Sequence, residues 1–226
     1  MNWDAIFTSL RLASLTSLIL LVLSLPLAAW LAFSRWRWRF LIESVVALPL
    51  VLPPTVLGFY ILTAMGSRSP LGRWYADLIG SPLPFTFEGL VFASVIYSLP
   101  FAVQPMASSF AAVDRNLVEV SWTLGISRLA TFFRLILPSA KNGVVTALVL
   151  TFAHTIGEFG VVLMVGGNIE GVTRTVSIDI YDQVQDLNYA AASRTSLVLL
   201  LFSFIVLAVV YSLNRNSPLW PTLRKR

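Results

Sequence analysis

Four long stretches of the chain contain no charged side chain, and they constrain its fold more than any other feature. They cover residues 12–33, 44–67, 89–113 and 195–214, and a fifth stretch, 142–169, is interrupted only by the carboxylate of Glu158. A helix that crosses the hydrocarbon core of a membrane needs about 20 apolar residues. These runs are too long for barrel strands, and in lipid the backbone must hydrogen-bond within its own segment. The sequence therefore predicts an all-α membrane protein with five transmembrane helices.

The composition supports this fold class and excludes several functions. Charged residues make up 12% of the chain, whereas soluble domains have about a quarter. The absence of cysteine and the single histidine, His154, argue against a metal centre. We find no nucleophile–base pair of the kind that would indicate an enzyme. The spans also contain too few charged residues for an ion-driven carrier. We expect one transmembrane domain over residues 1–226, with spans at about 12–33, 42–66, 88–112, 142–166 and 194–213.

The basic residues indicate how these spans are oriented. Eleven lie in the segments after the first, third and fifth spans, and four lie in the other connecting segments. Cytoplasmic loops of membrane proteins are enriched in Lys and Arg. The N-terminus is therefore expected outside and the C-terminus in the cytoplasm. Because topology accounts for the net charge of +5, no nucleic-acid partner is needed to explain it.

Prolines lie in the first three expected spans, and they are densest in the second. Pro49, Pro53 and Pro54 lie close together in the second span, and proline removes a helical hydrogen bond. Irregular backbone at membrane depth is tolerated where it is buried in protein or lines a watery cavity. The fourth span contains Glu158 between two glycines, and a carboxylate at that depth is costly. We expect these residues to form a gate or hinge, with Glu158 in a structural or gating role, paired with His154 or bonded to backbone N–H groups. The candidates are Pro49, Pro53, Pro54, Gly157, Glu158 and Gly160.

The segment 114–141 between the third and fourth spans is predicted to form two short cytoplasmic helices. Asp114 is a suitable N-cap for the first helix, and Gly125 can supply the left-handed residue that ends it. Leu117, Val120 and Leu124 give that helix an apolar stripe. Ser127 caps the second helix, which is expected to stop before Pro138. Such a pair makes a docking surface for a partner protein.

The same segment resembles a motif of a known family. Glu119-Val120-Ser121, then Gly125, then Leu135-Ile136-Leu137-Pro138 is similar to the EAA loop of bacterial ABC-importer permeases, whose pattern is EAA-x3-G-x9-I-x-L-P. Val120 and Ser121 replace the two alanines and Leu135 replaces isoleucine. The resemblance implies a type I importer fold in the bacterial cytoplasmic membrane. It also implies that the loop couples the permease to an ATPase subunit through the motif residues Glu119, Val120, Ser121, Gly125, Leu135, Leu137 and Pro138.

Further stretches narrow the resemblance to the molybdate, tungstate and sulfate permeases. They are the Leu-Pro-Leu-Val-Leu-Pro-Pro run at 48–54, Gly-Glu-Phe-Gly at 157–160 and Thr-Arg-Thr at 173–175. The last looks most like molybdate permeases, so tungstate comes second and sulfate or thiosulfate third. The resemblance implies two copies of this chain, two cytoplasmic ATPase subunits that bind ATP and Mg²⁺, and an extracytoplasmic oxyanion-binding protein. It implies no cofactor bound by this chain.

The segment between the fourth and fifth spans is the expected docking side for the binding protein. Three acidic residues there have the spacing of one helix face, which suits pairing with a basic partner and equally suits a solvated surface. The docking candidates are Arg174, Asp179, Asp182 and Asp186. The rival from another class is a membrane scaffold that transports nothing. It leaves the spacing of the EAA-like motif unexplained.

Overall fold

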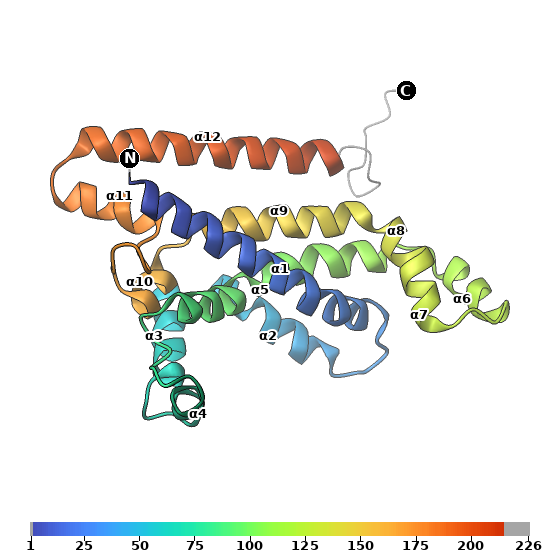
Figure 1. The fold of residues 1–226 in the computed structure, drawn as a ribbon. Coiled ribbons are helices and arrows are strands. Elements are labelled where there is room, and N and C mark those ends of the chain that lie inside the picture. Colours follow the sequence, from blue (N-terminus) through green and yellow to red (C-terminus); the bar gives the residue numbers. More distant parts are fainter. Residues whose placement is uncertain (1, 215–226) are drawn as a thin grey trace.

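The computed structural model describes residues 2–214, and that part of the chain consists of helices and their connections, with no strand. Figure 1 shows the long helices lying along one common direction. They are α1 (Trp3–Phe33), α2 (Arg39–Val51), α5 (Phe87–Ala111), α9 (Lys141–Gly157) and α12 (Tyr189–Asn214). The predicted all-α fold is confirmed. The basic residues at 215–226, which entered the orientation argument, lie outside the described residues.

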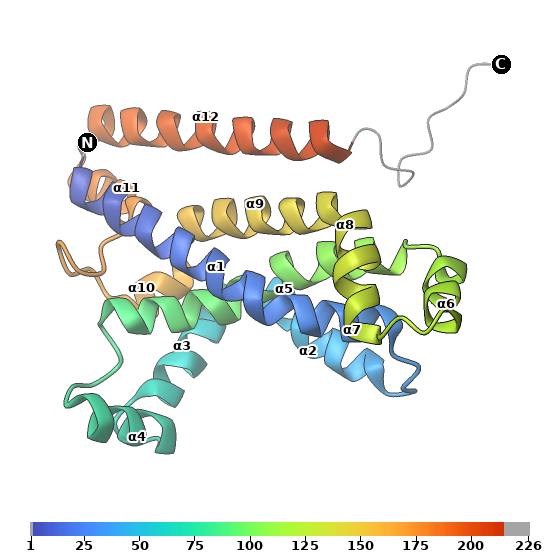
Figure 2. The same ribbon diagram turned by 45° about the vertical axis from the view of Figure 1, so that its right-hand side comes forward.

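The short helices gather at the two ends of this bundle (Figure 2). At one end lie α3 (Pro54–Met65), α4 (Pro70–Ile79), α10 (Gly160–Gly166) and α11 (Val176–Gln185). At the other lie α6 (Arg115–Thr123), α7 (Arg128–Thr131), the π-helix η1 (Phe132–Ile136) and α8 (Leu137–Ser139). We call these the α11 end and the α6 end. The start of α1 lies at the α11 end and the end of α12 lies at the other, so the described chain crosses the bundle an odd number of times.

Three helices are each long and apolar enough to cross a membrane, namely α1, α5 and α12. Two further candidates are bent pairs: α2 with α3 at 112°, and the 128–139 segment with α9 at 72°. The second expected span, 42–66, is therefore not one straight helix. It breaks at Leu52, which is extended with ψ 138° because the ring of the following proline, Pro53, disfavours helical backbone there. Four other prolines lie within helices without ending them: Pro26, Pro49, Pro100 and Pro105.

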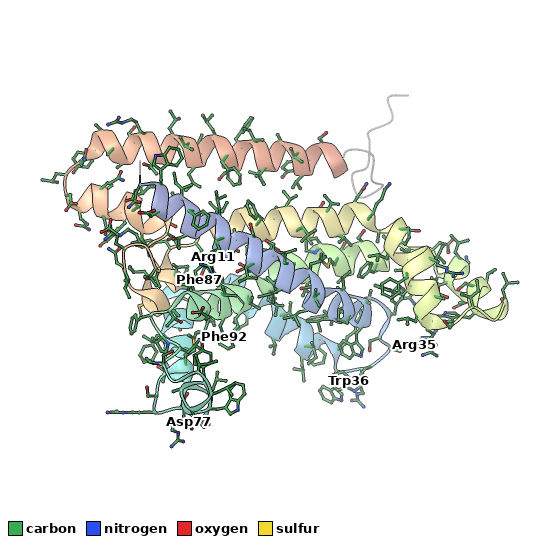
Figure 3. All side chains as sticks on the ribbon, in the orientation of Figure 1. Arg11, Arg35, Trp36, Asp77, Phe87 and Phe92 are labelled. Carbon is green, nitrogen blue, oxygen red and sulfur yellow. The ribbon has the colours of Figure 1, made fainter. Side chains whose placement is uncertain are left out.

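The core forms where α1 packs across α5 and α9. At the α6 end, Phe110 and Met106 of α5 are fully buried against α1. At the α11 end, the Arg11 guanidinium lies over the ring of Phe87, 4.2 Å from its centroid (Figure 3). Within a membrane such contacts stabilise the bundle through close van der Waals packing, because lipid tails are as apolar as the buried side chains. These contacts place α5 at the centre of the bundle, where it packs against both α1 and α9.

One buried hydrogen bond joins α1 to the start of α11. The backbone N–H of Val176, at the start of α11, donates to Ser9 Oγ of α1 at 2.8 Å, and Ser9 is 1% exposed. This N–H belongs to the first turn of α11 and has no partner within its own helix. Ser9 therefore fixes the position of α11 against α1.

Replacing Ser9 with alanine is expected to lower the thermal unfolding midpoint by several degrees, because an unpaired buried N–H costs about 1–3 kcal/mol. Thermal unfolding of the purified chain in detergent measures this. Ser14→Ala is the matched control, since Ser14 is an exposed serine of the same helix. Equal midpoints for the two variants would show that the bond does not contribute to stability.

Candidate translocation and coupling sites

A break in the fourth predicted span places Glu158 at the centre of a polar cluster. Helix α9 ends at Gly157, and Glu158 is extended with φ −67° and ψ 132° before α10 begins. Because the helix stops there, the expected pairing of His154 with Glu158 does not form. Each side chain instead contacts a serine of α5. Ser94 Oγ donates to Glu158 Oε2 at 3.1 Å, and Ser98 Oγ lies 3.0 Å from His154 Nδ1.

Glu158 is 3% exposed and is tied to two elements. Its side chain contacts α5 through Ser94, and its backbone carbonyl accepts a hydrogen bond from Ser177 Oγ of α11 at 2.6 Å. The second carboxylate oxygen, Oε1, is buried and has no hydrogen-bond partner among the described residues. The sequence-based alternative of backbone N–H groups bonding this carboxylate is therefore wrong. The residue holds the break in contact with both α5 and α11.

A cavity of about 580 Å³ lies beside this break, and we call it the gate cavity. It brings together Pro54 and Thr55 of α3, Tyr97 of α5 and the α9–α10 junction. Of the six gate candidates, Pro54, Gly157, Glu158 and Gly160 line it, whereas Pro49 and Pro53 do not. Both broken spans therefore meet at one cavity.

The two breaks touch through a glycine. A Cβ atom placed on Gly160 would lie 2.6 Å from the Cβ of Pro54, so no larger residue fits without movement of α3 or α10. Gly58 is equally close to α10, where an added Cβ would lie 2.8 Å from the Cβ of Met164. These contacts fix α3 and α10 against each other.

The sequence analysis did not identify the serines that hold this site. Ser94 and Ser98 lie one turn apart on α5, and they face Glu158 and His154, which lie one turn apart on the antiparallel α9 segment. Two serines at this spacing within an apolar span were the available signal, because small polar residues often bond between membrane helices. Nothing in the chain marked Ser177 as a contact of the Glu158 carbonyl.

At the α6 end, the helix signals of the predicted loop are confirmed. Asp114 caps α6 by accepting a hydrogen bond from the N–H of Asn116 at 2.9 Å. Gly125 adopts the left-handed conformation, with φ +78°. Ser127 caps α7 by accepting from the N–H of Ala130 at 3.3 Å. The loop is therefore a defined pair of short helices.

Helix α6 has two unlike faces. The apolar stripe of Leu117, Val120 and Leu124 is exposed, with 54%, 53% and 74% of each residue accessible. On another side, Glu119 lines a cavity of about 520 Å³ together with three arginines and aromatic side chains. The arginines are Arg35, Arg115 and Arg128. The stripe is therefore accessible to a partner in the described part of the chain.

The remaining motif residues join the loop to the span that follows it. Ser121 Oγ lies 2.9 Å from Thr131 Oγ1, and this buried pair holds α6 against α7. Leu135 lies in η1, and Leu137 and Pro138 lie in α8. The expectation that the second helix stops before Pro138 is wrong, because it continues to Ser139. The π-turn explains this, since Leu137 N–H bonds to the carbonyl of Phe132, and the wider turn makes room for the proline ring.

The structure alters the docking candidates in one respect. Asp179 is 7% exposed and accepts a hydrogen bond from Gln183, so it is not available to a partner. Burial raises the pKa of the Asp179 carboxyl, and its hydrogen bond with Asn2 opposes that rise. Arg174 lies within 3.7 Å of Asp182 and within 3.5 Å of Glu170. Only Asp186 of the three aspartates is an exposed residue, so the expectation of three aspartates on one free face is wrong.

No group of three or more His, Cys, Asp or Glu residues suited to a metal ion occurs among residues 2–214.

Comparison with known proteins identifies the family. The family described as "Binding-protein-dependent transport system inner membrane component" matches residues 24–217. The chain belongs to this family of ABC-importer permeases and is a component of the inner membrane.

Individual proteins agree with this assignment. The "Molybdenum transport system permease protein ModB" of Azotobacter vinelandii is 52% identical over 211 residues, covering 93% of each chain. The protein of that name from Escherichia coli K12 is 34% identical over 221 residues, covering 96% of this chain and 95% of its own. A bacterial alginate ABC transporter, crystallised with its alginate pentasaccharide-bound periplasmic protein, has the same fold. Its TM-score is 0.73 at 16% identity, over 94% of this chain and 77% of that one.

Proposed function

We propose that this chain is the permease subunit of an ATP-driven molybdate importer. The observation that carries the proposal is its similarity over 93% of its length to a molybdenum transport permease. Tungstate is the second candidate substrate and sulfate or thiosulfate the third, because the motifs of those permeases are similar. The family membership and the exposed stripe of α6 favour a coupled transporter over a membrane scaffold. The chain itself is not proposed to catalyse a reaction or to bind a cofactor.

The proposed complex contains two copies of this chain, two cytoplasmic ATPase subunits and an oxyanion-binding protein outside the membrane. Moving a dianion into a cell against the membrane potential costs roughly 4.6 kcal/mol per 100 mV, at about 2.3 kcal/mol for each charge. Within residues 2–214, the candidate spans hold no chain of ionisable groups that resembles a proton relay. ATP hydrolysis on partner subunits is the consistent energy source.

In this proposal the α6 end faces the cytoplasm, and the α11 end and the N-terminus face outward. The positive-inside distribution supports that orientation. The apolar stripe of α6 then enters a cleft in the ATPase subunit, with Glu119 and Gly125 fixing the helix and its end. ATP binding moves this loop, and the movement reaches the gate cavity through α9. The permease is thus a two-state switch that is biased by ATP at one end and by the loaded binding protein at the other.

Proteoliposomes containing the whole complex provide the test of substrate. With loaded binding protein outside and ATP inside, radioactive molybdate uptake is expected, with unlabelled tungstate competing more strongly than sulfate. Uptake of sulfate in preference to molybdate would reassign the substrate within the family. Absence of ATP-dependent uptake for all three oxyanions would contradict the transporter proposal.

Changes in the coupling loop are expected to separate ATP hydrolysis from transport. Glu119→Ala and Gly125→Val should each reduce the molybdate taken up per ATP by about tenfold, the loss expected from a strong interface residue. Thr123→Ala is the matched control, because the hydroxyl of Thr123 bonds only to carbonyls of its own helix. Unchanged transport in both variants would refute the assignment of this loop.

The contact between α11 and the α9–α10 break is proposed to carry the docking signal to the gate. Ser177→Ala removes the hydrogen bond to the Glu158 carbonyl, while Ser177→Thr keeps a hydroxyl. The alanine variant should reduce stimulation of the ATPase by the loaded binding protein about two- to tenfold, the effect of one lost hydrogen bond. Basal ATPase activity should be unchanged. Equal stimulation in the alanine and threonine variants would exclude this route.

A further inference from the structure

One face of the central helix α5 carries polar residues where a lipid-facing helix would be apolar. The polar residues Tyr97, Gln104 and Ser108 lie on a single face with Phe101, because the four are spaced at alternating intervals of four and three residues. The exposed side chains of Gln104 and Ser108 make no hydrogen bond to the rest of the described chain. Polar groups without partners are costly against lipid. This face is therefore suited to water rather than to lipid.

The part of that face nearer the α11 end, at Tyr97, lines the gate cavity. The part nearer the α6 end, at Gln104 and Ser108, lines a second cavity of about 620 Å³. This cavity lies between α1, α2 and α5, and we call it the inner cavity. Alanines on α2 and α5 leave the space open, among them Ala47 and Ala107. One helix face therefore leads from the gate cavity to the inner cavity.

The inner cavity has a cationic lining. Arg39 and Arg115 line it, and so do the carboxylate of Glu43 and the hydroxyl of Ser44. Arg39 Nε lies 3.5 Å from Glu43 Oε1, and Arg39 Nη1 donates to the Ser34 carbonyl at 3.3 Å. Arg115 forms no ion pair with the described residues. The formal charge of this lining is therefore one positive unit, and the Arg115 guanidinium is available to an anion.

We propose that the inner cavity is a low-affinity site for a tetrahedral oxyanion on the cytoplasmic side of the pathway. Arg39 and Arg115 supply the charge, while the amide of Gln104 and the hydroxyls of Ser44 and Ser108 donate hydrogen bonds. Arginine suits this role because its planar fork of donors matches oxyanion geometry. Glu43 keeps the attraction modest, and an anion that must leave the pathway has to be held weakly. The inference rests on the proposed function, because it places the transported anion in this cavity.

The phosphate of an anionic lipid has the same chemistry, since basic pockets at the cytoplasmic side of membrane helices bind such headgroups. The test must therefore separate an anion in solution from a headgroup. The absence of cysteine makes this possible, because a single introduced thiol is the only one in the chain. Ser108→Cys places that thiol in the inner cavity.

The whole complex carrying Ser108→Cys is placed in nanodiscs of phosphatidylcholine and treated with anionic or cationic methanethiosulfonate reagents. The permease peptide is then read by mass spectrometry. Relative to the control thiol, the ratio of the anionic to the cationic labelling rate is expected to be about tenfold higher, equivalent to 1.4 kcal/mol. Arg39→Gln and Arg115→Gln should each reduce this ratio, and millimolar molybdate should slow the labelling. Ser81→Cys is the control, because Ser81 is an exposed serine at the α11 end.

A rate ratio equal to that of the Ser81→Cys control, or a ratio unchanged by both arginine variants, would overturn the proposal. Protection by added phosphatidylglycerol without protection by molybdate would also overturn it and assign the cavity to a lipid headgroup. Failure of the proposed function is distinguishable. If the wild-type complex imports no molybdate but sulfate protects the thiol of the Ser108→Cys complex, the oxyanion site stands and the transported anion changes.

Discussion

The need to hydrogen-bond every backbone group in lipid governs this structure. Continuous helices meet that need directly, so α1, α5 and α12 cross the bundle without a break. The breaks at Leu52–Pro53 and at Glu158–Phe159 lie beside each other, and Glu158 is buried whereas Pro53 is exposed. Ser177 bonds the carbonyl that the second break exposes, and Ser94 bonds the carboxylate beside it. These two irregular stretches of backbone thus meet at one site.

Much of this arrangement could be predicted from local patterns. Uncharged runs located the crossings, and the caps Asp114 and Ser127 with Gly125 located the helices of the loop, because each signal acts within a few residues. The outcome at Pro138 could not be read in this way. Its tolerance depends on a π-turn that begins six residues earlier, at Phe132, and no proline rule anticipates it.

The cluster around Glu158 shows the same limit for tertiary contacts. The sequence indicated that Pro54, Gly157, Glu158 and Gly160 were unusual, and the structure brings them together. It gave no indication that Glu158 would face Ser94, because the pairing of α5 with α9 depends on how two apolar helices pack. The prediction that the three aspartates share one free face was wrong for a related reason. Their spacing marks a helix face, but spacing does not say whether that face is outside or, as at Asp179, against another element.

The π-turn at Phe132–Ile136 also determines a rotation. Each residue of an α-helix turns the chain by about 100°, and a π-turn holds one residue more than an α-helical turn. Everything on the N-terminal side of η1, including α6, is therefore set about 100° around the axis from where an unbroken helix would place it. The direction in which α6 presents its apolar stripe thus depends on one additional residue in a helix that it does not belong to. The additional residue of the π-turn therefore sets the angle at which α6 is held relative to the bundle.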